Sequence, residues 1–172
     1  TTSLLNTADS EPFEGNLLPG APMEDAPVEV GGKAGWLVDQ VGGRFQLVYF
    51  CDDPSAMSMR LQDQLQGLSK LSVPVDVLVV ARRPGICPFG VVIDHDGLAF
   101  QRYDARSGTA YLIRPDQHIA ARWREAEVSS ILAALDRATA LHEVASRLLE
   151  RSAITGECLT REMGKPYRES NW

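Results

Sequence analysis

The chain has 172 residues, of which 44% are hydrophobic and 23% charged, and its net charge is −6. These values are ordinary for one globular domain with an extension. The negative charge and the scattered Lys and Arg residues argue against nucleic acid or an anionic membrane as partner. No apolar run approaches the roughly 20 residues that a membrane-spanning helix needs.

The three cysteines, Cys51, Cys87 and Cys158, lie far apart, form no Cys-x-x-Cys pair and have no zinc-site spacing to a histidine. The first residues contain neither a basic region nor an apolar signal core. We therefore expect reduced thiols and a cytoplasmic protein. A disulfide between Cys51 and Cys87 stays open, because loops at one end of a sheet can meet.

Residues 1–27 are polar and contain four of the ten prolines. This composition predicts a linker segment laid over a surface rather than a core element. Short strands are expected at Val28–Val30 and Trp36–Val38, around Gly31-Gly32.

A strand, a helix and a second strand are predicted next. Phe45–Phe50 is a nearly continuous apolar run, as expected of a strand covered on both faces. Asp53 can cap the following helix, and Pro54 can occupy its first position. The helix has an apolar stripe formed by Met57, Leu61, Leu65 and Leu68. Val75–Ala81 is the second buried strand, so the two strands should be parallel.

The last part of the sheet is expected to be a hairpin. After a strand at residues 91–93 and a turn at Asp94–Gly97, the run Tyr111–Trp123 reads as a strand, a Pro115-Asp116 turn and a returning strand. The turn explains Asp94–Gly97 better than a metal or acid–base site does. A helix should begin at Glu125, and its apolar stripe continues through Ile131, Leu141 and Leu148 to about Arg151.

The hairpin run resembles a known family. With Arg114-Pro115-Asp116 at its turn and Ala121-Arg122-Trp123 at its end, it is similar to the last domain of FAD-dependent aromatic-ring hydroxylases. These are flavoprotein monooxygenases of the phenol and 3-hydroxyphenylpropionate type, whose last domain is thioredoxin-like. Residues 19–27 resemble the segment that leads into that domain, so the chain would begin near a domain boundary. The resemblance covers roughly residues 2–138.

The expected fold class is therefore α/β and thioredoxin-like: a βαβ unit, a β-hairpin and a C-terminal helix. Residues 28–138 would form this domain, and residues 139–172 would be a helical, then extended, C-terminal extension. The second half of the long helix would pack on its own domain, a flavin domain or a second copy.

Thiol chemistry is not expected. Placed on the thioredoxin pattern, Pro54 and Met57 stand where the two cysteines belong, and Gly108-Thr109 replaces the proline before the hairpin strand. Cys51 lies about three residues too early, and Asp52 and Asp53 should raise its thiol pKa. An ordinary half-buried cysteine explains Cys51 better than a redox role.

The resemblance implies a parent enzyme that uses FAD, NAD(P)H and O₂ to hydroxylate a phenolic compound. This chain lacks the strand–glycine turn–helix motif that FAD requires, so we expect it to bind no cofactor and no metal. It would support dimerisation or the flavin domain of the same polypeptide, with a homodimer expected. The alternatives are a stand-alone interaction module and a thiol oxidoreductase that uses Cys51.

The sharpest family residues are Arg114 and Asp116. They could contact a neighbouring domain or subunit, but an internal ion pair that fixes the hairpin explains them better. Arg122 and Trp123 could belong to an interface, where both residue types are enriched, and a core tryptophan is an equal alternative. Ile131, Leu141 and Leu148 are the interface candidates on the long helix.

Overall fold

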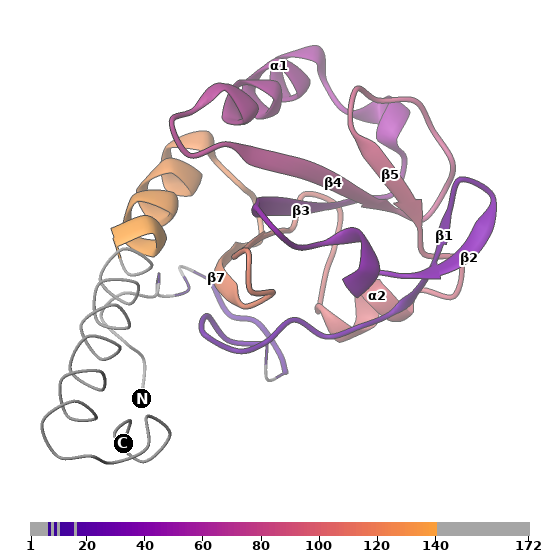
Figure 1. The fold of residues 1–172 in the computed structure, drawn as a ribbon. Coiled ribbons are helices and arrows are strands. Elements are labelled where there is room, and N and C mark those ends of the chain that lie inside the picture. The colour runs from indigo at the N-terminus through magenta and orange to yellow at the C-terminus, as the bar shows by residue number, and fades with distance from the viewer. Residues whose placement is uncertain (1–6, 8, 10, 16, 141–172) are drawn as a thin grey trace, which may run out of the picture. The chain divides into compact units, whose positions relative to one another are not determined.

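The computed structural model describes residues 7, 9, 11–15 and 17–140 (Figure 1). The chain divides into two compact units, residues 1–137 and residues 138–172. Leu141 and Leu148, and Cys158 with them, lie outside the described residues. The architecture below is that of the first unit.

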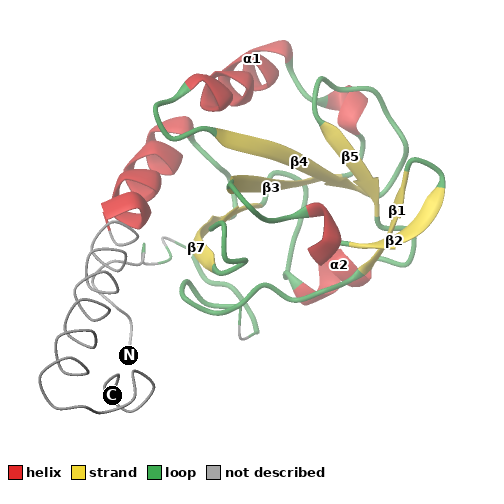
Figure 2. Cartoon of the chain, viewed as in Figure 1, coloured by secondary structure: helices red, strands yellow, loops and turns green. Residues whose placement is uncertain are grey.

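Seven strands of the described residues form one mixed sheet, in the order β2-β1-β5-β4-β3-β6-β7 (Figure 2). The strands are β1 (Pro27–Val30), β2 (Lys33–Trp36), β3 (Phe45–Cys51), β4 (Val75–Ala81), β5 (Gly90–Ile93), β6 (Ala110–Ile113) and β7 (Ile119–Trp123). The helices are α1 (Met59–Gly67), α2 (Leu98–Arg102) and the turns η1 (Val38–Gln40), η2 (Pro54–Ala56) and η3 (Leu68–Lys70). Residues 128–140 are also helical.

The centre of the sheet agrees with the prediction. β3 and β4 are parallel over their full length, from Phe45 opposite Val75 to Cys51 opposite Ala81. Both are buried, mostly apolar runs at the centre of the sheet, as expected of strands whose two faces are covered. β5 is parallel to β4, whereas β6 is antiparallel to β3.

The helix predicted from Pro54 is instead two elements. Asp53 accepts a hydrogen bond from the Ser55 amide (2.8 Å) and caps the single turn η2, with Pro54 at its first position. Met57 is then extended, with ψ of 126°, and Ser58 caps a new helix, α1, by accepting from the Leu61 amide at 3.3 Å. A second N-cap residue four positions after Pro54 thus explains the interruption.

The strand predicted at Trp36–Val38 is displaced towards the N-terminus. Gly31 and Gly32 have φ of +56° and +80°, which allows a two-residue turn between β1 and β2. This tight turn pairs Val30 with Lys33, so β2 begins at Lys33 and ends at Trp36. Val38 begins η1 instead.

The predicted hairpin is present as β6 and β7. Its turn contains Pro115 and Asp116, and Gln117 takes the left-handed conformation with φ of +62°. The helix that follows begins at residue 128 rather than at Glu125.

Figure 1 shows α1 and α2 on opposite sides of the sheet. On the side of α2, the core contains Val48, Phe50 and Tyr111 and is completed by Leu17, Met23 and Ala26 from the N-terminal segment. Our expectation that residues 1–27 contain no core element was therefore wrong. The five-residue helix α2 is too short to cover this face of the sheet, so the N-terminal segment supplies the remaining apolar side chains.

The turn at Asp94–Gly97 leads into α2, which the sequence did not predict. Gly97 is left-handed, with φ of +71°, and the buried Asp94 carboxylate accepts a hydrogen bond from the Phe100 amide at 2.9 Å. His95 contacts Glu29 at 3.0 Å on the surface. These residues thus form a turn and a helix cap.

Candidate functional site

The end of β3 is where a thioredoxin-like enzyme would have its thiols. Cys51 is the last residue of β3 and is buried, and its carbonyl accepts a hydrogen bond from the Arg82 amide at 3.3 Å. Pro54 and Met57, which occupy the positions of the two thioredoxin cysteines, are both buried. Neither side chain can act as a nucleophile.

Cys51 is a poor nucleophile in this environment. The pKa of its thiol is raised to about 12, mainly by burial and also by like-charge repulsion from Cys87, Asp52 and Asp53. At neutral pH the thiolate would be about one part in 10⁵ at that pKa, and the thiolate is the reactive form. The acids raise the pKa as we predicted, but burial is the larger cause.

The loop between β4 and β5 closes over η2. The Ile86 amide donates to Ser55 Oγ at 2.9 Å. A Cβ atom at Gly85 would lie 2.7 Å from Asp53 Oδ1 and 2.8 Å from both Pro54 Cδ and Ser55 Oγ. Only glycine allows this approach, and the loop therefore packs directly on the position where thiols would be exposed.

Cys87 lies in the same loop and is partly buried, and its sulfur is 3.9 Å from the Phe89 carbonyl oxygen. Cys51 and Cys87 are both free thiols in this structure. The Gly108-Thr109 peptide lies beside the end of β3, where the Phe50 amide donates to the Thr109 carbonyl at 2.8 Å.

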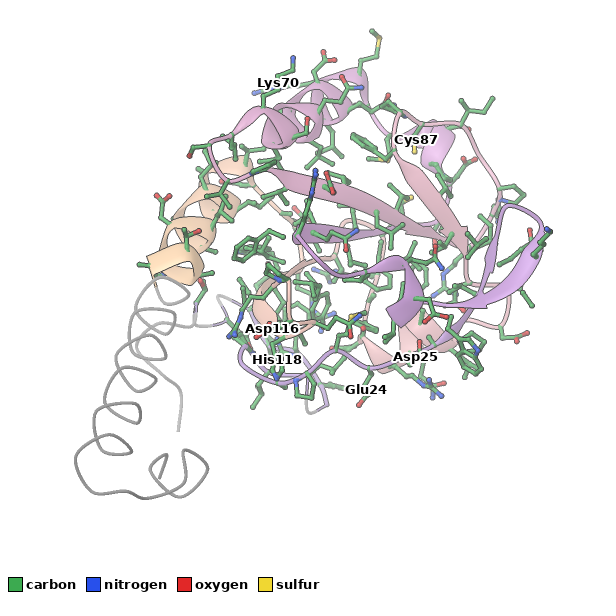
Figure 3. The ribbon with its side chains drawn as sticks, in the orientation of Figure 1. Glu24, Asp25, Lys70, Cys87, Asp116 and His118 are labelled. Atoms are coloured by element: carbon green, nitrogen blue, oxygen red, sulfur yellow. The ribbon has the colours of Figure 1, made fainter. Side chains whose placement is uncertain are left out.

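The hairpin turn forms a second cluster. Arg114 and Asp116 make an ion pair with each other, and His118 Nδ1 lies 2.9 Å from the Asp116 carbonyl oxygen. Figure 3 shows Asp116 beside His118, well apart from Cys87. Because Arg114 and Asp116 belong to the same turn, their ion pair is explained by a structural role, which is to hold the hairpin turn together.

Arg122 and Trp123 are buried within the described chain, with exposed fractions of 2% and 6%. Arg122 Nη2 contacts Asp9 Oδ2 at 2.6 Å, and its Nε contacts Asp9 Oδ1 at 3.0 Å. The sequence reasoning missed Asp9, because no local pattern relates it to a residue 113 positions away. Ile131 is fully buried in the first unit and offers no exposed surface.

The glycine cluster at residues 31–35 does not fit FAD. A flavin pyrophosphate needs a glycine turn between a strand and a helix N-terminus, whereas Gly31 and Gly32 connect two antiparallel strands. The nearest hollow, of about 210 Å³, is lined by residues of β1, β2 and β5 with His95 and Asp96. No group of the described residues has three side chains placed to bind a metal.

Solved structures with similar folds fall into two groups. The flavin-dependent monooxygenase PieE, solved with FAD and substrate, is 24% identical with a TM-score of 0.53, over 70% of this chain and 21% of PieE. Aklavinone-11 hydroxylase, solved with FAD and aklavinone, is 22% identical with a TM-score of 0.55, over 79% of this chain and 25% of the hydroxylase. A thiol peroxidase from Chromobacterium violaceum is 11% identical with a TM-score of 0.58, over 76% of this chain and 93% of the peroxidase.

The fold is thioredoxin-like. The thioredoxin-like region matches nearly the whole peroxidase, but the chain spans only about a fifth of PieE and a quarter of aklavinone-11 hydroxylase. No protein-family model and no curated protein matches the sequence. Among the residues that the structure describes, no helix is both long and apolar enough to cross a membrane.

Proposed function

We propose that this chain is the C-terminal thioredoxin-like domain of an FAD-dependent aromatic hydroxylase. In this role it contributes no catalytic residue and supports the flavin domain of the same polypeptide or the association of two subunits. The parent enzyme would use NAD(P)H, O₂ and FAD to hydroxylate a phenolic compound in the cytoplasm.

The observation that carries the proposal is the state of the site at the end of β3. Proline and methionine occupy the thiol positions, the pKa of the Cys51 thiol is raised to about 12, and the Gly85 loop packs over η2. A reductase or peroxidase needs an accessible thiolate. A domain that keeps the fold without one is better suited to packing than to thiol chemistry.

Two further observations support a hydroxylase as the parent. The run from Tyr111 to Trp123 resembles the last domain of these enzymes, and the flavin-dependent monooxygenase PieE and aklavinone-11 hydroxylase are each matched over only a fraction of their length. The glycine turn at residues 31–32 joins two antiparallel strands and does not suit a flavin pyrophosphate, so in this proposal FAD binds to another domain of the polypeptide.

The test is to sequence the reading frame around the codon for Thr1 and to purify the protein that the whole frame encodes. We expect a flavin-bound protein that consumes NAD(P)H and O₂ in the presence of a phenol and releases the hydroxylated product. The Cys51→Ser variant of that protein should have the same rate of product formation.

The matched control is the 172-residue chain alone, assayed for insulin reduction beside a thioredoxin. Insulin reduction that disappears in the Cys51→Ser chain would overturn the proposal in favour of a thiol oxidoreductase. A frame without a flavin-binding region would overturn it in favour of an independent interaction module.

A further inference from the structure

Three arginines hold the N-terminal segment against the end of the sheet. We call residues 9 and 11–14 the strap. Arg122 binds both carboxylate oxygens of Asp9, at 3.0 Å and 2.6 Å. Arg106 lies 3.5 Å from Glu11, and Arg124 donates to the Pro12 carbonyl from Nε at 3.2 Å and from Nη2 at 3.0 Å. Each arginine thus has its own acceptor in the strap.

An aromatic side chain lies at the centre of this contact. Two guanidinium groups contact the Phe13 ring, with the Arg122 Cζ atom 4.4 Å and the Arg124 Cζ atom 3.9 Å from its centroid. Its edge meets the Tyr111 ring at a centroid distance of 6.0 Å. Cation–π contacts of this kind select an aromatic residue at this position.

The site needs an acidic occupant. The Arg122 side chain is almost completely buried, so its charge requires a paired carboxylate. Arg124 is also paired with Asp104, and Asp104 accepts a hydrogen bond from the Glu14 amide at 2.7 Å. Without the strap, no carboxylate of the described residues would lie within ion-pair distance of Arg122, and Asp104 would act on it only at longer range.

The strap is joined to the core through a residue that can change the chain direction. Gly15 is exposed and has φ of +84°, and a Cβ atom there would meet no other atom within 4 Å, whereas Leu17 is buried in the core. Glycine allows a change of backbone direction here at little steric cost. In an exchange of straps between copies, the change of chain direction would fall at Gly15, and Leu17 would remain in the core.

We propose that Arg106, Arg122 and Arg124 form a docking site for an acidic segment with one aromatic residue, and that the strap of a second copy of this chain can fill it. In the structure the strap of the same chain occupies the site. Exchange of this identical element between two copies would produce a symmetric dimer. The docking chemistry does not depend on the hydroxylase proposal, because all of its groups are in this chain.

The first test uses the full chain with the strap weakened by Asp9→Asn, Glu11→Gln and Phe13→Ala. A fluorescein-labelled peptide of residues 7–15 should bind this variant and should bind the unmodified chain at least about tenfold more weakly, because the linked strap competes at an effective concentration near millimolar. Fluorescence anisotropy measures the binding. A peptide of the same composition in scrambled order is the control.

The second test adds Arg122→Met or Arg106→Met to the strap-weakened chain. Each should reduce peptide binding, whereas Arg60→Met on α1, far along the chain from this site, should not. Arg106 is largely exposed, so its variant tests the site even if the Arg122 variant does not fold. The proposal of a docking site is overturned if the folded, strap-weakened chain does not bind the peptide.

The third test concerns the second copy. In a mixture of two variants, the strap-weakened chain supplies an unfilled docking site. The Arg122→Met chain supplies an intact strap that its own weakened site holds less tightly. Sedimentation should detect a one-to-one complex in the mixture that neither chain forms alone. Peptide binding without such a complex would overturn the exchange between copies.

Discussion

Leu17 and Leu18 provide a direct measurement of whether the N-terminal segment belongs to the folded domain. The two residues are chemically identical neighbours, but Leu17 is 4% exposed and Leu18 is 52% exposed. Leu17 belongs to the core on the α2 side of the sheet. The perturbation is the pair of variants Leu17→Ala and Leu18→Ala in the full chain.

The expected magnitude follows from burial. Truncation of a buried leucine to alanine costs about 2–5 kcal/mol, made up of lost transfer free energy and a cavity term. For Leu17→Ala we expect about 3 kcal/mol, near the middle of this range. For a domain of this size that corresponds to a decrease of about 6–12 °C in Tm. Leu18→Ala should change the free energy of unfolding by less than about 0.5 kcal/mol.

The assay is urea unfolding at equilibrium, followed by tryptophan fluorescence and circular dichroism. The tryptophan signal reports on the sheet, because Trp123 is buried in β7. Equal free energies of unfolding for the two variants, within about 0.5 kcal/mol, would refute the reasoning and restore the interpretation of this segment as a linker.

Three further predictions test the site and the strap. Iodoacetamide should alkylate Cys51 in the native chain at pH 8 about a thousandfold more slowly than in urea, given a pKa of about 12 against an ordinary value near 8.5. Peptide mass spectrometry separates Cys51 from the other two cysteines, which are left in place because Cys87 contributes to the shift; equal rates would contradict a buried thiol. Gly85→Ala should cost about 1–3 kcal/mol through overpacking, whereas Gly67→Ala, with open space around it, should be neutral or stabilising; equal Tm values would contradict the close approach. Burial opposes the ionisation of Asp104, but hydrogen bonds from the Glu14 amide and Arg124 lower its pKa below 3.8. The stabilisation from the ionised carboxylate is therefore complete above pH 3.8 and is lost as pH falls through the lower pKa of the folded state. In urea unfolding, Asp104→Asn should be less stable than the unmodified chain near neutral pH, and a difference that does not shrink in acid would contradict the lowered pKa.

The elements predicted correctly are those whose signal is local. β3 and β4 are continuous apolar runs, and the β6–β7 hairpin contains its own turn residues. The β2 boundary was wrong because turn geometry at Gly31-Gly32, rather than hydrophobicity, sets the register. α2 was missed because it has only five residues, and a helix so short has no apolar period to detect.

The candidate site was predictable only in part. Once a thioredoxin-like fold is assumed, Pro54 and Met57 at the two thiol positions predict that the catalytic thiols are absent. Asp52 and Asp53 beside Cys51 predict that its thiol pKa is raised. The closure of the loop at Gly85 and the contact between Asp9 and Arg122 depend on residues that meet only after the sheet has formed. A local pattern cannot contain that information.

The N-terminal segment that covers the α2 side of the sheet has a consequence for folding during synthesis. Leu17 and Met23 leave the ribosome about 90 residues before Tyr111 and Ile119, the core residues on which they pack. The backbone bond from the Gly20 amide to the Ile119 carbonyl, at 2.7 Å, likewise joins the two ends of the domain. Within this domain, the segment that is made early can therefore become ordered only late, and the nascent chain must keep its apolar side chains from other apolar surfaces until β7 has emerged.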